Sequence, residues 1–132
     1  MSFNLEIVSP VKMVFQGEVK SVTIPGTLGS FQVLQNHAPL ISTFIVGKIK
    51  VDKDSESMLF ATSGGVFEVK NNKAIILADS IESKEDIDIE RARLSKIRAE
   101  EILKISDSSV KDKEEAKLAV QRAENRIKSI EN

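Results

Sequence analysis

The chain has 132 residues with 19 basic and 20 acidic side chains, one histidine and no cysteine. This length allows one domain with a core and a small appendage, and it excludes two independent enzymatic lobes. The balanced charge argues against a nucleic-acid partner, and the composition excludes disulfides, cysteine-ligated zinc and a histidine-rich metal site.

Two parts of the chain differ in composition. All six glycines, all three prolines and all six phenylalanines lie in residues 1–80. Residues 81–132 hold all five arginines, and 12 basic and 13 acidic residues occur among these 52 positions. We therefore predict an α+β chain in which a β-rich part precedes a helical part.

Residues 1–80 contain seven short runs of β-prone residues that are separated by turn residues. Runs of this length and spacing are typical of antiparallel strands in a sandwich or a flattened barrel. The runs cover residues 5–8, 18–24, 30–34, 48–51, 58–62, 66–70 and 74–77.

Short asparagine and glycine pairs mark connections between these strands. Asn71-Asn72 predicts a tight two-residue hairpin, because asparagine tolerates positive φ. Gly64-Gly65 has two interpretations, a bulge or turn between strands and a place where another backbone approaches closely. The strand that Gly47 opens alternates apolar residues with lysines, which predicts one buried face and one wet face.

His37 is the one histidine of the chain, and it precedes Ala38-Pro39 in a turn. Two roles are open for it, a turn or interface residue and a catalytic base. The sequence supplies no neighbouring nucleophile or orienting acid, and it contains no glycine-rich phosphate loop. We therefore expect a protein that is not an enzyme and that requires no cofactor or metal.

The N-terminal segment has neither a basic start nor a long apolar stretch. The longest apolar runs, such as residues 74–78, are too short to cross a membrane. We expect no signal peptide, no transit peptide and no membrane span.

The hydrophobic period becomes helical from Asp86 onward, and Ser83 three residues earlier is a start signal. We predict a first helix that ends near Ile105, a break at residues 106–109 and a second helix capped by Asp112. Together these helices form an antiparallel hairpin. The residues on its packing side are Ala92, Ala99, Ile102, Leu103, Ala116, Ala119, Ala123, Ile127 and Ile130.

The predicted seam between the helices is thin, because alanine contributes little buried area and each methylene is worth about 0.8 kcal/mol. Two interpretations are open. The hairpin either docks permanently, or it opens and closes as a two-state element whose marginal stability makes switching easy.

The arginines of the two predicted helices differ in their neighbours. Arg91 and Arg98 each have an acidic residue three positions away. Arg122 and Arg126 have none at three or four positions. Folding the hairpin would bring Arg126 level with Arg91. It would also bring Arg122 close to Arg98. The four guanidinium groups either converge on an anion such as a phosphate chain, or they meet water and glutamates across the hairpin.

Several motifs of the chain occur together, in the same order and spacing, in one known family. They are Leu5-Glu-Ile-Val-Ser-Pro10, Gly26-x-x-Gly29-x-Phe31-x-x-Leu34, His37-Ala-Pro-Leu40, Ser63-Gly-Gly65, Ile75-Ile-Leu-Ala-Asp79 and Ile87-Asp88-x-x-Arg91-Ala92. On these residues the chain resembles the epsilon subunit of bacterial F-type ATP synthases. The resemblance implies an N-terminal antiparallel β-sandwich of about ten strands in residues 1–84 and a C-terminal two-helix hairpin in residues 85–132.

The resemblance also implies a non-catalytic central-stalk (rotor) subunit of a proton-translocating F-type ATP synthase. Such a subunit couples rotation of the membrane ring to the catalytic head, and its mobile hairpin inhibits ATP hydrolysis. The implied partners are the gamma subunit, the c-ring and the catalytic alpha and beta subunits, at the cytoplasmic face of the cell membrane. The rotor-interface positions are Gly29, Ser30, Phe31, His37, Ala38 and Pro39.

Some members of this family bind ATP in the folded hairpin through a motif that residues 87–92 resemble. The matching nucleotide-binding positions are Glu82, Ile87, Asp88, Arg91, Ala92, Arg98, Arg122 and Arg126. The resemblance thus implies ATP as a regulatory ligand, with the arginines on phosphate and with Ile87 and Ala92 against adenine. Ser30 and Gln35-Asn36 depart from the residues that many relatives carry in the rotor-contact region.

One alternative of a different class is a free-standing ligand-binding β-sandwich with a helical oligomerisation tail. Carbohydrate-binding modules present exposed tryptophan or tyrosine, and the chain contains neither. The sequence therefore supports this alternative less than it supports a rotor subunit.

Overall fold

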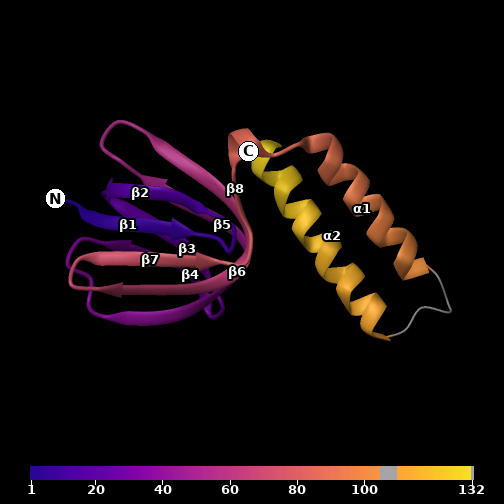
Figure 1. Cartoon of the computed structure of the whole chain (residues 1–132), viewed down its shortest axis with the longest axis horizontal. Coiled ribbons are helices and arrows are strands. Elements are labelled where there is room, and N and C mark those ends of the chain that lie inside the picture. Colours follow the sequence, from indigo (N-terminus) through magenta and orange to yellow (C-terminus); the bar gives the residue numbers. More distant parts are fainter. Residues whose placement is uncertain (105–109, 132) are drawn as a thin grey trace. The chain divides into compact units, whose positions relative to one another are not determined.

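The computed structural model describes residues 1–104 and 110–131, and the chain divides into two compact units (Figure 1). Residues Met1–Ser83 form a strand unit, and residues Lys84–Asn132 form a helical unit. The predicted order of a β-rich part and a helical part is confirmed. Across the described ranges, no helix combines the length and the apolar character that a membrane crossing requires.

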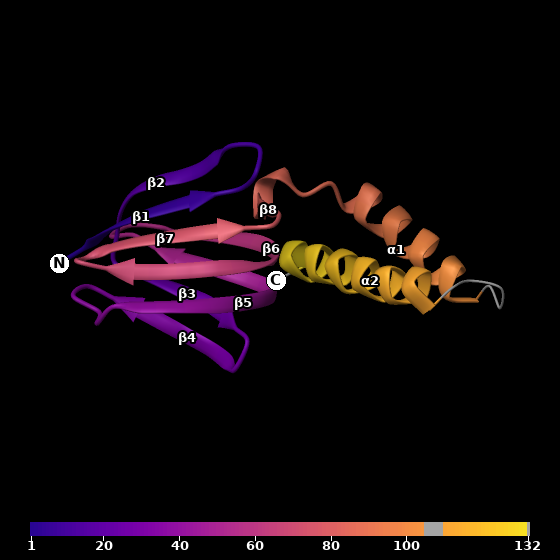
Figure 2. The same ribbon diagram turned by 60° about the horizontal axis from the view of Figure 1, so that its bottom comes forward.

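All residues of the strand unit are described, and they form eight strands (Figures 1 and 2). The strands are β1 (Phe3–Val8), β2 (Met13–Val19), β3 (Ser21–Gly26), β4 (Gly29–Leu34), β5 (Leu40–Asp52), β6 (Ser57–Lys70), β7 (Lys73–Ala78) and β8 (Ile81–Ser83). Their order is β2-β1-β7-β6-β5-β3-β4, and β8 pairs with β6. All these pairs are antiparallel except β1 with β7.

The predicted sandwich class is confirmed, and two details of the prediction are corrected. β5 and β6 are single strands of 13 and 14 residues, so they replace several of the expected short strands and lower the count from about ten to eight. The pairing of β1 with β7 is parallel rather than antiparallel. These two strands are far apart in the chain, so no tight turn forces them to run in opposite directions.

Gly64 and Gly65 lie inside β6, and its pairing with β5 and β7 shows no register shift there, so their interpretation as a bulge or turn between strands is wrong. β6 pairs with β7 on one side of this site and with β8 on the other side. The φ angle of Gly65 is +158°, and a Cβ atom there would lie 2.1 Å from the carbonyl oxygen of Leu77. The second interpretation, a close approach of another backbone, is therefore correct.

Other local predictions concern single turns and strands. Asn71-Asn72 joins β6 to β7 with φ angles of +52° and +60°, which confirms the predicted hairpin. The alternation in β5 is confirmed as well, since Ile49 is fully buried and Lys50 is exposed. The run at residues 18–24 is divided between β2 and β3, because the chain turns at Lys20.

The core of the strand unit is built from large apolar side chains. Phe31 and Phe67 meet edge to face, with their ring centroids 5.8 Å apart. Complete burial of one such side chain stabilises the fold by about 1.5–3 kcal/mol. The largest fully buried side chains are Phe3, Leu5, Ile7, Val19, Val22, Ile24, Val33, Ile49, Val51, Phe67, Val69 and Ile76.

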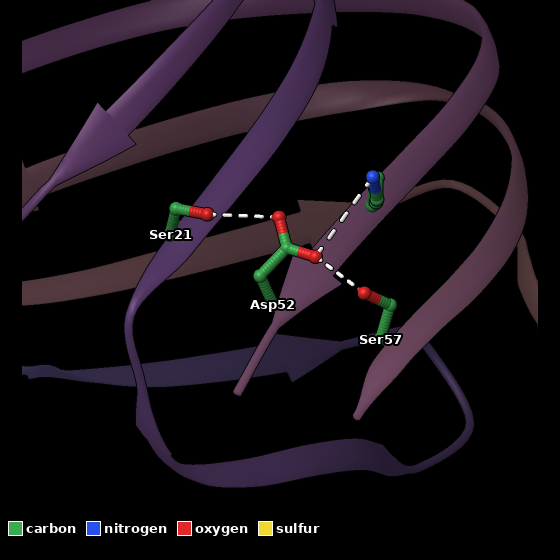
Figure 3. A network of polar contacts seen from close by, with 4 residues as sticks. Ser21, Asp52 and Ser57 are labelled. Carbon is green, nitrogen blue, oxygen red and sulfur yellow. Dashed lines mark hydrogen bonds and ion pairs between the residues drawn. The ribbon is translucent and has the colours of Figure 1, made fainter. Parts of the chain in front are cut away.

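A polar network connects the end of β5 to its two neighbouring strands (Figure 3). Asp52 accepts hydrogen bonds from the Ser57 hydroxyl at 2.5 Å and from the Ser21 hydroxyl at 3.0 Å. The Lys50 ammonium lies 3.9 Å from the same carboxylate. The hydrogen bond from Ser57 is the main cause that lowers the pKa of Asp52, with further lowering by Ser21 and Lys50 against the opposing effect of burial. The network therefore favours the ionised carboxylate.

The helical unit is a hairpin of two helices that lie side by side in both views (Figures 1 and 2). A 3-10 helix at Lys84–Asp86 comes first, and α1 (Ile89–Lys104) and α2 (Val110–Glu131) follow. Alanines form the buried seam, as their spacing predicts, and these are Ala92, Ala99, Ala116 and Ala123. The other predicted seam residues are only partly buried or exposed, and these are Ile102, Leu103, Ala119, Ile127 and Ile130.

The starts of both helices differ from the prediction. Asp88 caps α1, because its Oδ1 accepts the backbone N–H of Arg91 at 3.1 Å. The predicted start at Ser83 is wrong, since the 3-10 helix intervenes before α1. Asp112 lies inside the first turn of α2 rather than at its cap. The predicted break at residues 106–109 lies outside the described residues.

Candidate functional site

A groove of about 530 Å³ lies between α1 and α2. Each helix contributes residues spaced three, four and seven positions apart, because such residues share one face of a helix. The residues that line the groove are Ser95, Arg98, Ala99, Ile102, Asp112, Glu115, Ala116, Ala119 and Arg122.

Arg98 and Arg122 line this groove from opposite helices, as the folded hairpin predicts. In the described part of the chain, neither guanidinium group has a carboxylate oxygen within 4 Å. Arg98 therefore forms no ion pair with Glu101, although their spacing would allow one. Two exposed cations on one groove repel each other, and an oxyanion between them would accept hydrogen bonds from both.

The groove also has an acidic part on α2. Asp112 and Glu115 share the α2 wall with Arg122. Both residues are exposed, and Asp112 takes part in a further interaction. These carboxylates lower the positive potential and so limit the affinity for anions. The arrangement suits an oxyanion held by the two arginines, with the Ser95 hydroxyl as an additional donor.

Metal ligands are a separate question, because phosphate chains often carry a divalent cation. Within residues 1–104 and 110–131, no group of three His, Asp or Glu side chains is placed to hold a metal ion. The groups that the groove offers to an anion are the guanidinium groups of Arg98 and Arg122 and the hydroxyl of Ser95.

The other two predicted arginines do not line the groove. Arg91 is exposed in the first turn of α1, and its backbone N–H is held by the capping carboxylate of Asp88. Arg126 takes part in an interaction of its own. Of the four arginines that the sequence analysis expects to converge, Arg98 and Arg122 line this groove.

The remaining predicted nucleotide residues lie elsewhere. Ile87 and Ala92 are buried, so they offer no open apolar surface to a nucleotide base in this structure. Glu82 lies on β8 in the strand unit, where it is partly buried and takes part in an interaction. The groove thus supplies hydrogen-bond donors for phosphate, but Ile87 and Ala92 supply no exposed contact for a base.

The predicted rotor-interface residues occupy two places on the strand unit. Gly29 and Phe31 on β4 line a groove of about 450 Å³, and Ser30 is exposed between them. Gly29 has a φ of +130°, which a glycine adopts without strain. The residues that line this second groove are Gly26, Thr27, Leu28, Gly29, Phe31, Ile41, Ser42 and Thr43.

His37, Ala38 and Pro39 lie in the loop between β4 and β5 and do not line that groove. Nδ1 of His37 lies 2.6 Å from the carbonyl oxygen of Ala38. Because a carbonyl oxygen can only accept, the Nδ1–H group donates this hydrogen bond. The backbone N–H of Asn36 donates to Oδ1 of Asn72 at 2.8 Å, which ties the loop to the β6–β7 hairpin. The structure thus brings Gly29 and Phe31 together and keeps this loop apart from their groove.

An exposed apolar surface crosses four neighbouring strands, and the sequence analysis missed it. Met13 on β2 is the cross-strand partner of Val8 on β1, and Val8 is also paired with Leu77 on β7. Leu77 is in turn paired with Val66 on β6. Met13, Leu77 and Val66 are 49%, 53% and 39% exposed. Paired residues point to the same face of a sheet, so these four side chains form one surface, which we call the apolar row.

The apolar row was hard to find because its strands are not consecutive in the chain. Each member is a single apolar residue at an outward-facing position, which is unremarkable on its own. A set of such residues becomes a signal only when the order β2-β1-β7-β6 is known. Contiguous exposed apolar residues of this kind mark interaction surfaces.

Comparison with known families assigns both units. The beta-sandwich domain of the ATP synthase Delta/Epsilon chain matches residues 2–84, and the long alpha-helix domain of the same chain type matches residues 85–131. The chain belongs to the ATP synthase delta/epsilon family. This assignment confirms the resemblance that the sequence motifs indicate.

Similar members of the delta/epsilon family are ATP synthase epsilon chains of bacteria. The epsilon chain of Desulforamulus reducens is 41% identical over 128 residues, which cover 97% of this chain and 96% of the relative. The epsilon chain of Desulfitobacterium hafniense is 40% identical over 131 residues, which cover 99% and 98%. The similarity to epsilon chains therefore extends over both units.

Solved structures of similar fold come from two mitochondrial ATP synthases. One chain of the Euglena gracilis OSCP/F1/c-ring structure has a TM-score of 0.81 at 18% identity and covers 94% of this chain and 78% of its own length. One chain of the Tetrahymena thermophila central stalk/c-ring structure has a TM-score of 0.65 at 14% identity and covers 96% and 95%. At these identities the likeness shows the fold alone.

Proposed function

We propose that this epsilon-family chain is a non-catalytic central-stalk subunit of a proton-translocating F-type ATP synthase, bound peripherally at the cytoplasmic face of the cell membrane. The observation that carries the proposal is the match of both family domains, with epsilon chains about 40% identical over nearly the whole length. The two grooves are lined by arginine, acidic, small and apolar side chains, which supports binding rather than catalysis.

The strand unit is the part that attaches the chain to the rotor. The apolar row lies on four hydrogen-bonded strands, so it offers a preformed surface for the gamma subunit at little cost in ordering. The exposed residues at Gly29–Phe31 and in the His37 loop contact the c-ring. Coupling of ring rotation to the catalytic head then follows from simultaneous attachment to both partners.

Co-purification with the gamma subunit tests the attachment. Leu77→Lys places a charge in the apolar row and should abolish or strongly weaken capture by gamma, since a buried charge without a partner is costly. Leu34→Lys is the matched control, because Leu34 on β4 is 55% exposed and lies outside the row. Failure of the unaltered chain to co-purify with gamma, where a known rotor pair does, would contradict the stalk assignment.

The helical unit is the part that restrains ATP hydrolysis. Its alanine seam is thin, so the hairpin can leave its folded form and extend toward the catalytic alpha and beta subunits, where it blocks hydrolysis. ATP whose phosphates are held by Arg98 and Arg122 binds only the folded hairpin. A ligand with this preference stabilises the folded form by about 2.7 kcal/mol at a hundredfold excess over its Kd.

Thermal unfolding of the helices with and without ATP tests the nucleotide part of the proposal. ATP should raise the midpoint of the unaltered chain, and Arg98→Ala or Arg122→Ala should remove this rise. Arg93→Ala is the matched control, because Arg93 pairs with Glu90 at 3.6 Å and does not line the groove. A midpoint that millimolar ATP leaves unchanged would contradict ATP binding while leaving the stalk assignment intact.

A further inference from the structure

The two sides of the alanine seam carry different charge arrangements. Ala99 on α1 and Ala123 on α2 lie in the buried seam. Arg98 and Arg122 line the groove on one side of it. Lys96 and Glu124 do not line the groove, although each lies within two positions of a groove arginine. With about 100° of rotation per residue, positions two apart on a helix lie far apart around its axis. The groove arginines and these two residues therefore flank the seam.

On the groove side of the seam, repulsion between like charges favours separation of the two helices. Arg98 and Arg122 face the same space without a carboxylate oxygen within 4 Å in the described part of the chain. Like charges on neighbouring helices repel, and this repulsion falls when the helices move apart. An oxyanion between the two groups converts the repulsion into attraction.

The opposite side holds the helices together. Nζ of Lys96 on α1 lies 3.5 Å from Oε1 of Glu124 on α2, and their side chains are 35% and 42% exposed. This ion pair joins two different helices, whereas the pair between Arg93 and Glu90 lies within α1 and does not join them. Partial burial limits its screening by salt relative to a fully exposed pair.

From these contacts we infer that the Lys96–Glu124 pair is the latch that keeps the hairpin closed when no anion occupies the groove. The latch and the groove anion stabilise the same closed form from opposite sides of the seam. Apparent anion affinity equals the intrinsic affinity multiplied by the closed fraction, so loss of the latch weakens anion binding without touching the groove. The regulatory meaning of the latch rests on the proposed function, but its effect on closure does not.

The latch is tested by measuring hairpin closure in the full chain. The chain contains no cysteine, so Leu94→Cys and Lys128→Cys allow a pair of distance probes on exposed positions of α1 and α2. Glu124→Lys should lower the closed-to-open ratio roughly tenfold, because attraction to Lys96 becomes repulsion. The charge swap of Lys96→Glu with Glu124→Lys should restore it. Glu114→Lys on the exposed face of α2 makes the same change in net charge and should leave the ratio within about twofold.

Addition of inorganic triphosphate and of ATP separates the latch from the proposed nucleotide function. Either ligand should partly restore closure of Glu124→Lys, with an apparent Kd raised in inverse proportion to the closed fraction that remains. If neither ligand changes the distance in any variant, anion binding in the groove is overturned while the latch stands. If Glu124→Lys leaves closure as Glu114→Lys does, or if the charge swap fails to restore it, the latch is overturned.

Discussion

The strand unit and the helical unit each have a buried interior, and the side chains that fill these two interiors differ greatly in size. Phe3, Ile7 and Phe67 are at most 1% exposed in the strand unit, whereas the buried apolar residues on the described parts of α1 and α2 are alanines such as Ala99 and Ala123. Burial of a large side chain stabilises by about 1.5–3 kcal/mol, and one methyl group contributes about 0.8 kcal/mol. Closure of the helical unit therefore depends on much less buried apolar area per residue than the fold of the strand unit does.

Truncation of a core aromatic should produce the largest effect on this comparison. Phe67→Ala removes a fully buried ring that meets Phe31, and it should lower the free energy of unfolding of the strand unit by about 3–5 kcal/mol. Urea denaturation measures the change. Leu77→Ala on the exposed apolar row is the control, and we expect a loss below about 0.5 kcal/mol. Equal losses for both variants would contradict the assignment of the core.

Overpacking the alanine seam should produce the next largest effect and confine it to the helical unit. Ala123→Leu adds three carbon atoms at a fully buried position and should destabilise the closed hairpin by about 1–3 kcal/mol. The free energy of unfolding of the strand unit should stay unchanged, as measured by urea denaturation with a signal that reports on the β-sheet. Lys117→Leu on the exposed face of α2 serves as the control. A hairpin that tolerates leucine at position 123 would mean that the seam does not limit closure.

The Asp52 network should give a smaller and pH-dependent effect in the strand unit. The pKa of Asp52 in the folded chain lies below the ordinary value of 3.8, so its contribution to stability is present above that value. The contribution is lost as the pH falls through the lowered pKa of the folded state. Ser57→Ala should cost about 1 kcal/mol at neutral pH and almost nothing at the acid end of this range. Ser55→Ala in the same turn is the control, and a pH-independent loss for Ser57→Ala would contradict this account.

Removal of a groove carboxylate should give the smallest effect. Glu115→Gln raises the positive potential beside Arg122 and should strengthen binding of inorganic triphosphate by about twofold to threefold. Titration calorimetry measures the affinity. Glu114 lies outside the groove, so Glu114→Gln should change the affinity less. Identical affinities for the two variants would show that the acidic part of the groove does not act on the anion.

The fold was predictable wherever one periodicity dominated a segment. The alternation around Ile49 and the helical spacing of the seam alanines identify their elements correctly. The first half of β5 was missed, because the residue types in Leu40–Val46 do not alternate. Its exposed positions include the apolar residues Ile41 and Ile45, although burial itself alternates along the strand. β8 has three residues, so its strand conformation depends on pairing with β6 rather than on a pattern of its own.

The candidate site was predictable only as far as helix geometry reaches. The meeting of Arg98 and Arg122 follows from folding the hairpin about its centre, and the structure places both on one groove. The interaction of Arg126 depends on the placement of side chains that spacing does not give. The start of α1 was misplaced because Ser83 and Asp88 are both suitable capping residues, and tertiary structure selects the second.

Hydrogen exchange of the full chain with and without ATP compares the local stability of the two units. We predict that amides of α1 and α2 exchange faster than those of the buried strands β1, β6 and β7, and that ATP slows exchange in the helices alone. Arg122→Ala should remove the effect of ATP without changing the strands. Helices that exchange as slowly as the core strands, or an ATP effect of equal size in both units, would contradict a rigid attachment joined to a weakly closed, anion-responsive hairpin.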